Sequence, residues 1–355
     1  MEFLADIATT VLGQLQKPTL AFLISGMVLA ALGSRLTVPD AVYKFIVMVL
    51  LLKVGMGAGI SLRAADLAEL AVPALAAAGL GVGIVLLGAL TLARRPGISH
   101  MDGMATAGLF GAVSASTLAA GMAMLDAEGI AYEGFIGALY PFMDIAALVT
   151  AIVLARLTAE RRVATGIQAD GTATFSSGSG GFGLGEAARS AGIRDILVDT
   201  ARSPAISALL LGLAIGILAR PDAVYESFYQ TLFHGLLSVL MLTMGIEAWS
   251  RLSELRKVAH SYVLYGLAAP VVHGFLGLGA GLLVHQVTGF SQGGVVLLAV
   301  LAASSSDISG PPTLRAALPE ANPSSYLGAS TGLGTPMAIL TIPLWIALAE
   351  TFMGG

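Results

Sequence analysis

The sequence predicts an all-α integral membrane protein with ten transmembrane helices, arranged as two inverted five-helix repeats with broken helices 4 and 9. Three observations support this prediction. Of the 355 residues, 56% are hydrophobic and 11% are charged, whereas a soluble domain carries about 25% charged residues. Apolar runs recur at the length of about 20 residues that crosses a bilayer. Two polar clusters interrupt these runs at matching positions in the two halves.

Ten apolar segments meet the length of a membrane span. They are 18–35, 41–61, 71–93, 104–126, 134–156, 204–220, 230–250, 260–285, 293–317 and 326–351. The intervening polar segment, 157–203, is rich in glycine, serine and threonine, which is typical of a flexible linker. We therefore expect a first five-helix repeat at 1–156, a cytoplasmic linker at 157–203 and a second repeat at 204–355.

The basic residues in the connections predict the orientation. Most of them fall on the side of the central linker, whereas Lys17, Arg63 and Arg220 fall on the other side. Because cytoplasmic loops carry the excess of Lys and Arg, we expect the linker in the cytoplasm and both termini outside. Two lysines remain within the second span. Lys44 is close enough to the cytoplasmic end to reach the interface, but Lys53 lies deeper.

The two halves of the chain carry matching residues in register. Each half has five spans, an odd number, so the second half enters the membrane upside down relative to the first. Inverted repeats with interrupted helices at corresponding positions predict a secondary transporter with a site near the bilayer midplane. The matched pairs are Ser114 with Ser304, Ser116 with Ser306, Gly57 with Gly245 and Arg63 with Arg251.

Two polar stretches interrupt spans four and nine: GAVSASTLAA at 111–120 and AASSSDISGPP at 302–312. Pro311 and Pro312 have no amide hydrogen, and Pro311 disfavours a helical conformation at Gly310. A broken helix persists in a bilayer only where protein or a water-filled cavity satisfies its freed groups. Any single serine here would more often bond a neighbouring turn or helix. The paired clusters, in contrast, favour a binding site whose exposed helix N-termini attract anions.

Two carboxylates lie within the spans, Asp144 in span five and Asp307 in the break of span nine. A carboxylate at this depth usually marks an ion site or proton relay, with a vestibule acid or a structural pair as the alternative. Carboxylate and hydroxyl oxygens, including those of Ser116 and Thr117, are suitable ligands for a hard cation. Hydroxyls and backbone amides without a mid-depth arginine favour a small, singly charged anion. The residues therefore predict a cation-coupled symporter of a small anion, with Na⁺ mildly favoured over protons.

Six stretches carry a resemblance to a known family. They are GQLQKPTLAFLISGM, GLFGAVSAST, GALYPFMD, LMLTMGIEAWSR, AASSSDISGPPTLRA and STGLGTPMAI. They resemble the sodium-dependent bicarbonate transporters of cyanobacteria and other bacteria, the high-affinity bicarbonate permeases, over nearly the whole chain except the central linker. This resemblance implies Na⁺-coupled symport of bicarbonate into the cell by alternating access. It also implies a place in the plasma (cell inner) membrane and a role in a carbon concentrating mechanism.

The resemblance implies an assembly and partners as well. It suggests a homotrimer in which spans 1, 2, 6 and 7 form a gate and spans 3–5 and 8–10 form a core. It makes a PII-like regulatory protein a candidate partner at the cytoplasmic face. At matching positions, bicarbonate would lie between Phe110, Gly111, Ala112, Val113 and Ser114 on one side and Ser304, Ser305 and Ser306 on the other. The Na⁺ ligands would be Ser116, Thr117, Asp144 and Asp307.

Other functions remain open at the level of the sequence. A sodium symporter of another small anion or organic acid would share the repeats, and a channel would share the paired half-helices. An enzyme would need a nucleophile and base pair, which is not visible, so we expect no catalytic residues. The histidines lack metal-ligand spacing, so we expect no transition metal and no cofactor beyond Na⁺ as the coupling ion. The net charge of −4 does not suggest a nucleic acid partner.

Overall fold

The computed structural model describes residues 17–63, 67–164, 198, 202–255 and 260–354, and the regular elements in those ranges are helices. Seven of these helices are long and apolar enough to cross a membrane, and three shorter apolar helices accompany them. Each of them overlaps one of the ten predicted apolar segments, although in the ninth, 293–317, the apolar helix ends at Ala303. The chain is therefore an all-helical, multi-pass membrane protein. Most of the predicted linker, at 165–197 and 199–201, lies outside the described residues.

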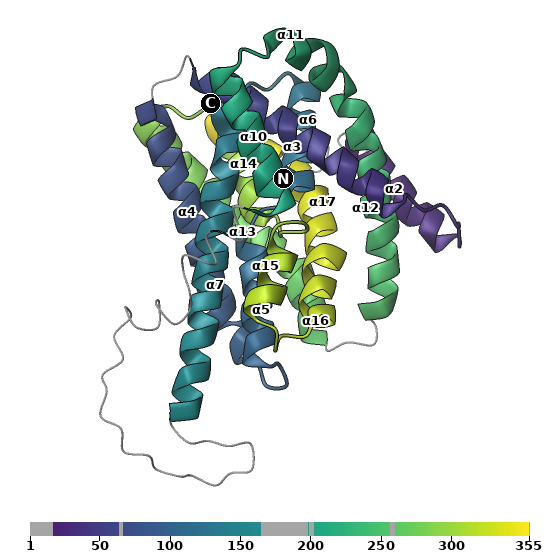
Figure 1. The fold of residues 1–355 in the computed structure, drawn as a ribbon, viewed down its shortest axis with the longest axis vertical. Coiled ribbons are helices and arrows are strands. Elements are labelled where there is room, and N and C mark those ends of the chain that lie inside the picture. The colour runs from purple at the N-terminus through teal and green to yellow at the C-terminus, as the bar shows by residue number, and fades with distance from the viewer. Residues whose placement is uncertain (1–16, 64–66, 165–197, 199–201, 256–259, 355) are drawn as a thin grey trace.

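The first half begins with two helices that cross the body of the protein at an angle and continues with helices along its long axis (Figure 1). Pro18 opens the first helix, because its fixed φ suits a helix start and its missing amide hydrogen would be unbonded there anyway. The elements are α2 (Pro18–Ala31), α3 (Asp40–Leu62), α4 (Leu67–Leu90), η1 (Leu92–Arg94), α5 (His100–Gly111), α6 (Ala115–Glu128), η2 (Gly134–Ala138) and α7 (Leu139–Ala164).

The second half starts in the same way, with Pro204 as the first residue of α10 and the Ser203 hydroxyl accepting the Ile206 amide hydrogen at 3.3 Å. Two of its segments, η3 and η4, are π-helical. The elements are α10 (Pro204–Leu218), α11 (Asp222–Val224), η3 (Tyr225–Gln230), α12 (Thr231–Leu255), α13 (His260–Thr288), α14 (Gln292–Ala303), α15 (Gly310–Ala317), α16 (Pro323–Leu327), η4 (Gly328–Gly334) and α17 (Thr335–Met353).

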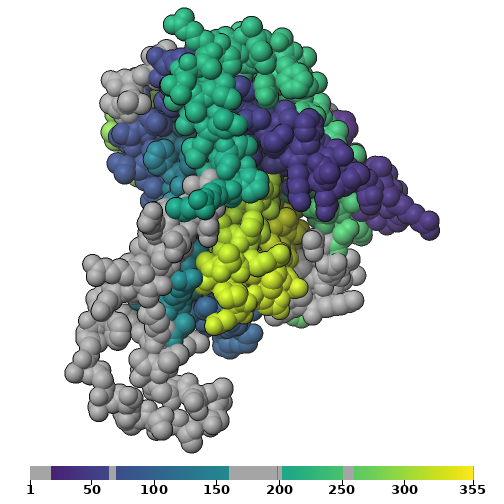
Figure 2. All heavy atoms as spheres, in the orientation of Figure 1, coloured from purple at the N-terminus to yellow at the C-terminus, as the bar shows by residue number. Residues whose placement is uncertain are grey.

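Two groups of helices pack around different partners. In the first group, α2 lies along α12 and α3 lies along α10, and Figure 2 shows α2 in purple and α10 in teal at the surface. In the second group, α4 packs on α5, α7 and α13, and α13 packs on α14 and α17. Helices α6 and α14 are enclosed, because every residue of Ala115–Leu125 and of Gly293–Ala303 is buried.

Glycines bring the backbones of α2 and α12 into direct contact. A Cβ atom on Gly26 would overlap the backbone oxygen of Leu242, and one on Gly245 would overlap that of Leu23. Close approach at small residues is the usual way that helices associate in a membrane, where no hydrophobic force drives them together. The α2–α12 pair therefore depends on the absence of side chains at these two positions.

The break of span nine differs in position from the sequence-based expectation. Gly310, which was expected to be non-helical, is the first residue of α15, and Pro311 follows it in the first turn. The prolines therefore start the second half-helix, because the first turn of a helix needs no amide hydrogens from them. The interruption lies before them, at 304–309, and it includes Asp307 as expected.

The glycine contact in α2 generates a stability prediction. Gly26→Ala should lower the free energy of unfolding by about 1–3 kcal/mol, because the added methyl group forces α2 away from α12. The matched control is Gly79→Ala in α4, where an added Cβ has no neighbour within 4 Å. Thermal unfolding of the purified protein in detergent checks this. Equal melting temperatures for the two variants would contradict the close packing.

Candidate functional site

The two helix interruptions lie against each other inside the protein. The Ser114 amide donates a hydrogen bond to Ser304 Oγ at 3.2 Å, and the Ser306 amide donates to the Leu109 carbonyl at 2.8 Å. Unwound backbone from one break is thus satisfied by the other, which is how a broken helix survives in an apolar medium. We call the joined interruptions, residues 112–114 and 304–309, the helix crossing.

Four helix ends converge at the helix crossing. The C-termini of α5 and α14 enter it, and the N-termini of α6 and α15 leave it. Ser114 Oγ caps α6 by accepting the Thr117 amide hydrogen at 3.2 Å, and Ser306 Oγ accepts the Gly310 amide hydrogen at 2.8 Å. Helix N-termini carry partial positive charge and C-termini partial negative charge. The crossing therefore offers both an anion and a cation favourable electrostatic surroundings.

The residues expected at the bicarbonate site come together at this point. Phe110 at the end of α5 packs edge-on against Tyr265, with ring centroids 5.0 Å apart, and against His273 at 6.1 Å. The two predicted segments, far apart in the sequence, therefore face each other deep inside the protein. Each of the following is 0% exposed: Phe110, Ala112, Val113, Ser114, Ser304, Ser305 and Ser306, and Gly111 is buried with them.

Two of the four expected Na⁺ ligands, Ser116 and Asp307, lie on one chain of side-chain hydrogen bonds, which Thr117 joins through its backbone amide. Ser114 Oγ and Ser116 Oγ are 2.8 Å apart, and Ser116 Oγ donates to Asp307 Oδ2 at 2.7 Å. Asp307 Oδ1 and Thr117 Oγ1 are buried and have no hydrogen-bond partner among the described residues. Buried oxygens normally have partners. Two that lack one, beside a carboxylate, are the ligand type that a hard cation takes.

Asp144 reaches the helix crossing from α7. Its Oδ1 accepts hydrogen bonds from the Val113 amide at 3.0 Å and from Ser309 Oγ at 3.2 Å. Its Oδ2 is buried without a partner in the described part of the chain. Asp144 is 0% exposed. It thus fixes the unwound backbone of one break with one oxygen and leaves the other free for a ligand.

Four residues at the helix crossing were not predicted from the sequence. Ser309 joins Asp144 to Tyr140, whose hydroxyl lies 3.2 Å from Ser309 Oγ. Ser330 in the π segment η4 donates to the Ser306 carbonyl at 3.2 Å, and Thr335 donates to the Ser305 carbonyl at 3.1 Å. The stretch STGLGTPMAI contains Ser330 and Thr335, so the signal was present in the sequence. The hydrogen-bond partners of these two residues could be identified only from the structure.

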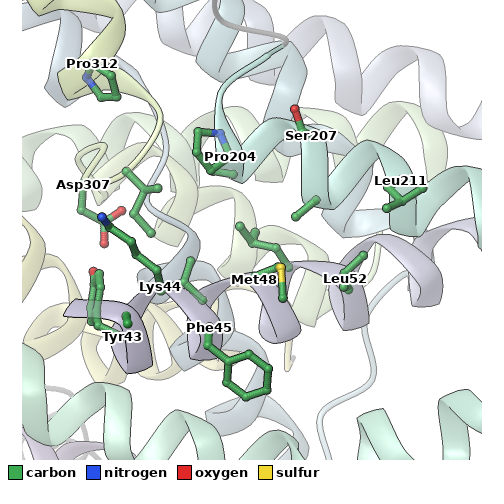
Figure 3. A pocket seen from close by; sticks show the side chains of 16 residues that line it. Tyr43, Lys44, Phe45, Met48, Leu52, Pro204, Ser207, Leu211, Asp307 and Pro312 are labelled. Atoms are coloured by element: carbon green, nitrogen blue, oxygen red, sulfur yellow. The ribbon is translucent and has the colours of Figure 1, made fainter. Parts of the chain in front are cut away.

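A cavity of about 810 Å³ reaches the helix crossing from one side. It lies between the beginnings of α3 and α10, and its lining includes Tyr43, Lys44 and Asp307 (Figure 3). Lys44 and Asp307 occupy the same end of the cavity in this view. Asp307 and Ile308 are the lining residues that this cavity shares with the helix crossing. The cavity therefore brings open space up to the Asp307 carboxylate.

Two broken helices that cross inside an all-helical membrane protein, with polar groups and unpartnered oxygens at the crossing, are typical of secondary transporters. The comparison with protein families agrees with this class. The model of the Na⁺-dependent bicarbonate transporter superfamily matches residues 18–350, and the chain belongs to this superfamily. The resemblance found in the sequence is therefore confirmed. A search of curated proteins gives no significant match.

The Ser304 hydroxyl generates a prediction about the helix crossing itself. It accepts the Ser114 amide and donates to the Leu301 carbonyl at 2.7 Å. Ser304→Ala should lower the free energy of unfolding by about 1–3 kcal/mol, because it leaves a buried amide unsatisfied.

Thermal unfolding in detergent measures this effect. Ser238→Ala is the matched control, since the exposed Ser238 hydroxyl bonds only one turn back, to the His234 carbonyl at 2.8 Å. If the melting temperatures of the two variants were the same, the two breaks would not support each other through this bond.

Proposed function

We propose that this protein carries bicarbonate into the cell together with Na⁺ by alternating access, and that both ions bind at the helix crossing. The family supports bicarbonate and Na⁺ as the transported ions. One observation carries the assignment to the crossing. Two helix N-termini meet there beside Asp144 and Asp307, and each carboxylate has one buried oxygen without a partner among the described residues.

Charge balance supports the coupling of the two ions. Bicarbonate beside a bare carboxylate would be repelled by about 4 kcal/mol at 4 Å and an effective dielectric of 20. Sodium at Asp144 and Asp307 lowers that repulsion, so Na⁺ binding favours binding of the anion. Moving an anion into a negative cell costs about 2.3 kcal/mol per 100 mV. A co-transported Na⁺ offsets this cost and contributes its own gradient.

We assign the ten spans to two inverted repeats, 1–156 and 204–355, joined by the linker 157–203. The helix pairs α2–α12 and α3–α10 support this assignment, since exchanging the repeats converts one pair into the other. The glycine contacts follow the same exchange, with α2 and α10 related by a shift of 186 residues and α3 and α12 by a shift of 190. Gly26 lies against the backbone oxygen of Leu242 and nitrogen of Ile246, and its counterpart Gly212 lies against those of Leu52 and Met56. In the same way, Gly55 lies against the oxygen of Leu209 and nitrogen of Leu213, and its counterpart Gly245 lies against those of Leu23 and Met27.

This packing revises two matches made in the sequence, Gly57 with Gly245 and Arg63 with Arg251, which both rest on a shift of 188 residues. The counterpart of Gly245 is Gly55 rather than Gly57, because Gly55 and Gly245 make the equivalent contacts. The same shift of 190 residues relates Ser114 to Ser304. The serine pairs and the match of α3 with α12 therefore follow one register, which supports a common internal repeat.

We divide the helices into a gate and a core. The gate comprises α2, α3 and α10 to α12, and the core comprises α4 to α7 and α13 to α17. The two packing groups described above support this division. The 810 Å³ cavity lies where the two parts meet, between gate helices α3 and α10 and the core residue Asp307. Movement of the core against the gate would then expose the crossing to either face of the membrane.

The remaining assignments rest on the basic residues and on the family resemblance. The distribution of Lys and Arg supports a cytoplasmic linker and termini outside. The resemblance supports the cell inner membrane, a homotrimer and a PII-like regulator at the cytoplasmic face. It also supports transport without catalysis, with Na⁺ as the coupling ion.

Uptake into proteoliposomes tests the proposed function. Labelled bicarbonate should accumulate when Na⁺ is present outside and should fall to background when choline or K⁺ replaces it at constant pH and voltage. The Na⁺ dependence follows from the charge balance at the crossing. Uptake that is equal in all three cations would refute the coupling. Stronger uptake of another small anion or organic acid would keep the coupling and change the substrate.

The two carboxylates generate a second functional prediction. Asp144→Asn and Asp307→Asn should each raise the Na⁺ concentration for half-maximal uptake by at least about tenfold, because one contact to a charged group contributes about 1.5–3 kcal/mol. Asp222→Asn is the matched control. It removes the carboxylate of an exposed ion pair, 2.8 Å from Arg63. Exposed ion pairs contribute little to the free energy of unfolding. Sodium titrations that coincide for all three variants and the unaltered protein would remove both carboxylates from the cation site.

A further inference from the structure

Lys53 is a buried cation that the helix crossing does not use. It lies on α3, is 3% exposed, and has no hydrogen bond or ion pair with another described residue. Its ammonium group lies 4.0 Å from the centroid of the Phe233 ring on α12. The ring attracts the positive charge but cannot accept the hydrogen bonds of three N–H groups. A lysine inside a membrane protein normally has a partner or lines a route for ions.

The Lys53 side chain lines a cavity of its own, about 260 Å³ in volume. Four other polar side chains line it: Ser61, Tyr132, Tyr225 and Gln230. Lys53 alone among the lining residues is charged. A water molecule occupies about 30 Å³ of liquid, so the cavity has room for bicarbonate and several waters. Ammonium, hydroxyl and amide groups together match the oxygens and the single O–H of bicarbonate.

Glycine allows two of these hydroxyls to reach the cavity. A Cβ on Gly57 would lie 2.7 Å from the Tyr225 hydroxyl oxygen, and one on Gly134 would overlap the Ser61 hydroxyl. Both glycines line the cavity. Larger residues would displace the hydroxyls, so this polar pocket depends on the absence of side chains at two positions.

This cavity and the larger one lie along successive parts of α3, the larger from Ala41 to Leu52 and the smaller from Lys53 to Ser61. Lys44 and Lys53 stand nine positions apart on α3, or about 14 Å at 1.5 Å per residue. Lys44 lines the larger cavity with Asp307, and Lys53 lines the smaller one with Met122 of α6. Met122 lies about 9 Å along α6 from Ser116 in the crossing. The smaller cavity also lies between gate elements α3 and η3 and core elements α6 and η2.

We propose that Lys53 forms an entry subsite that captures bicarbonate on the outer side before it passes to the helix crossing. The proposal rests on the proposed function and its orientation. Among the nearby carboxylates that oppose an anion is Asp126, which is exposed and accepts the Tyr132 hydroxyl hydrogen bond at 2.9 Å. The exposed pair Arg63–Asp222 lies at the same end of α3 and is neutral overall. Lys53 therefore supplies the attraction within the cavity.

Uptake kinetics of variants that remove or retain the positive charge at Lys53 test the entry subsite. Lys53→Met should raise the KM for bicarbonate about tenfold, as expected for losing one contact to a charged group, with Na⁺ half-saturation within about twofold. Lys53→Arg should stay near the KM of the unaltered protein. The matched control Arg220→Met removes a positive charge from the loop before α11 and should leave the KM unchanged. A lower maximal rate with an unchanged KM in Lys53→Met would overturn the proposal, as would equal effects of Met and Arg.

A chemical rescue remains informative even if Lys53→Met assembles poorly. The chain contains no cysteine, so Lys53→Cys introduces a single thiol. Outside aminoethyl methanethiosulfonate should attach an ammonium group and restore the low KM, whereas the sulfonatoethyl reagent should not. Bicarbonate should slow both reactions. Two outcomes would overturn the entry subsite: a thiol that reacts with neither reagent, or a KM for bicarbonate that is the same with the positive and the negative adduct. Because Na⁺-dependent uptake by the unaltered protein is measured in parallel, this failure is distinct from failure of the proposed function.

Discussion

The hydrogen bonds that join the two helix interruptions are the constraint on which the rest of the structure depends. Within a bilayer, unwound backbone must find partners in the protein or in a cavity. The Ser114 amide finds Ser304 Oγ, and the Ser306 amide finds the Leu109 carbonyl. Because each break needs the other, α6 and α14 must be enclosed by the surrounding helices. The same requirement brings four helix ends together and creates the charge pattern that two ions of opposite sign can share.

Patterns along the chain predicted much of this arrangement. Apolar length located the ten segments, and the two serine clusters located both interruptions, since polar groups inside an apolar run are costly in a bilayer unless they bond unwound backbone or a ligand. The two prolines of span nine were less informative about where its helix is interrupted. Pro311 and Pro312 start a half-helix rather than break one, because a first turn tolerates them. Ser330 and Thr335 were not predicted as part of the site, since a π segment that arrives from a distant helix leaves no periodic signal. We propose Gly55 rather than Gly57 as the counterpart of Gly245, because only packing reveals which glycine contacts a backbone.

The two cavities relate the crossing to the membrane faces. The larger reaches Asp307 between α3 and α10, and the smaller surrounds Lys53 between α3 and α6. Each contains one lysine of α3, a helix that packs on α10 of the second half. In the proposed mechanism, the two lysines of α3 attract bicarbonate towards the crossing, and the carboxylates repel it until Na⁺ has bound. The attracting and repelling groups are on different helices, so movement of these helices relative to each other would couple binding to transport.

Equilibrium binding of bicarbonate to the purified protein tests the central claim most directly, because it separates site formation from movement. Calorimetric titration should detect bicarbonate binding in Na⁺ and lose it in choline at the same pH and ionic strength. Linkage requires the reciprocal effect, an increase in Na⁺ affinity by the same factor when bicarbonate is present. Equal bicarbonate affinity in Na⁺ and in choline would contradict a shared site at the helix crossing.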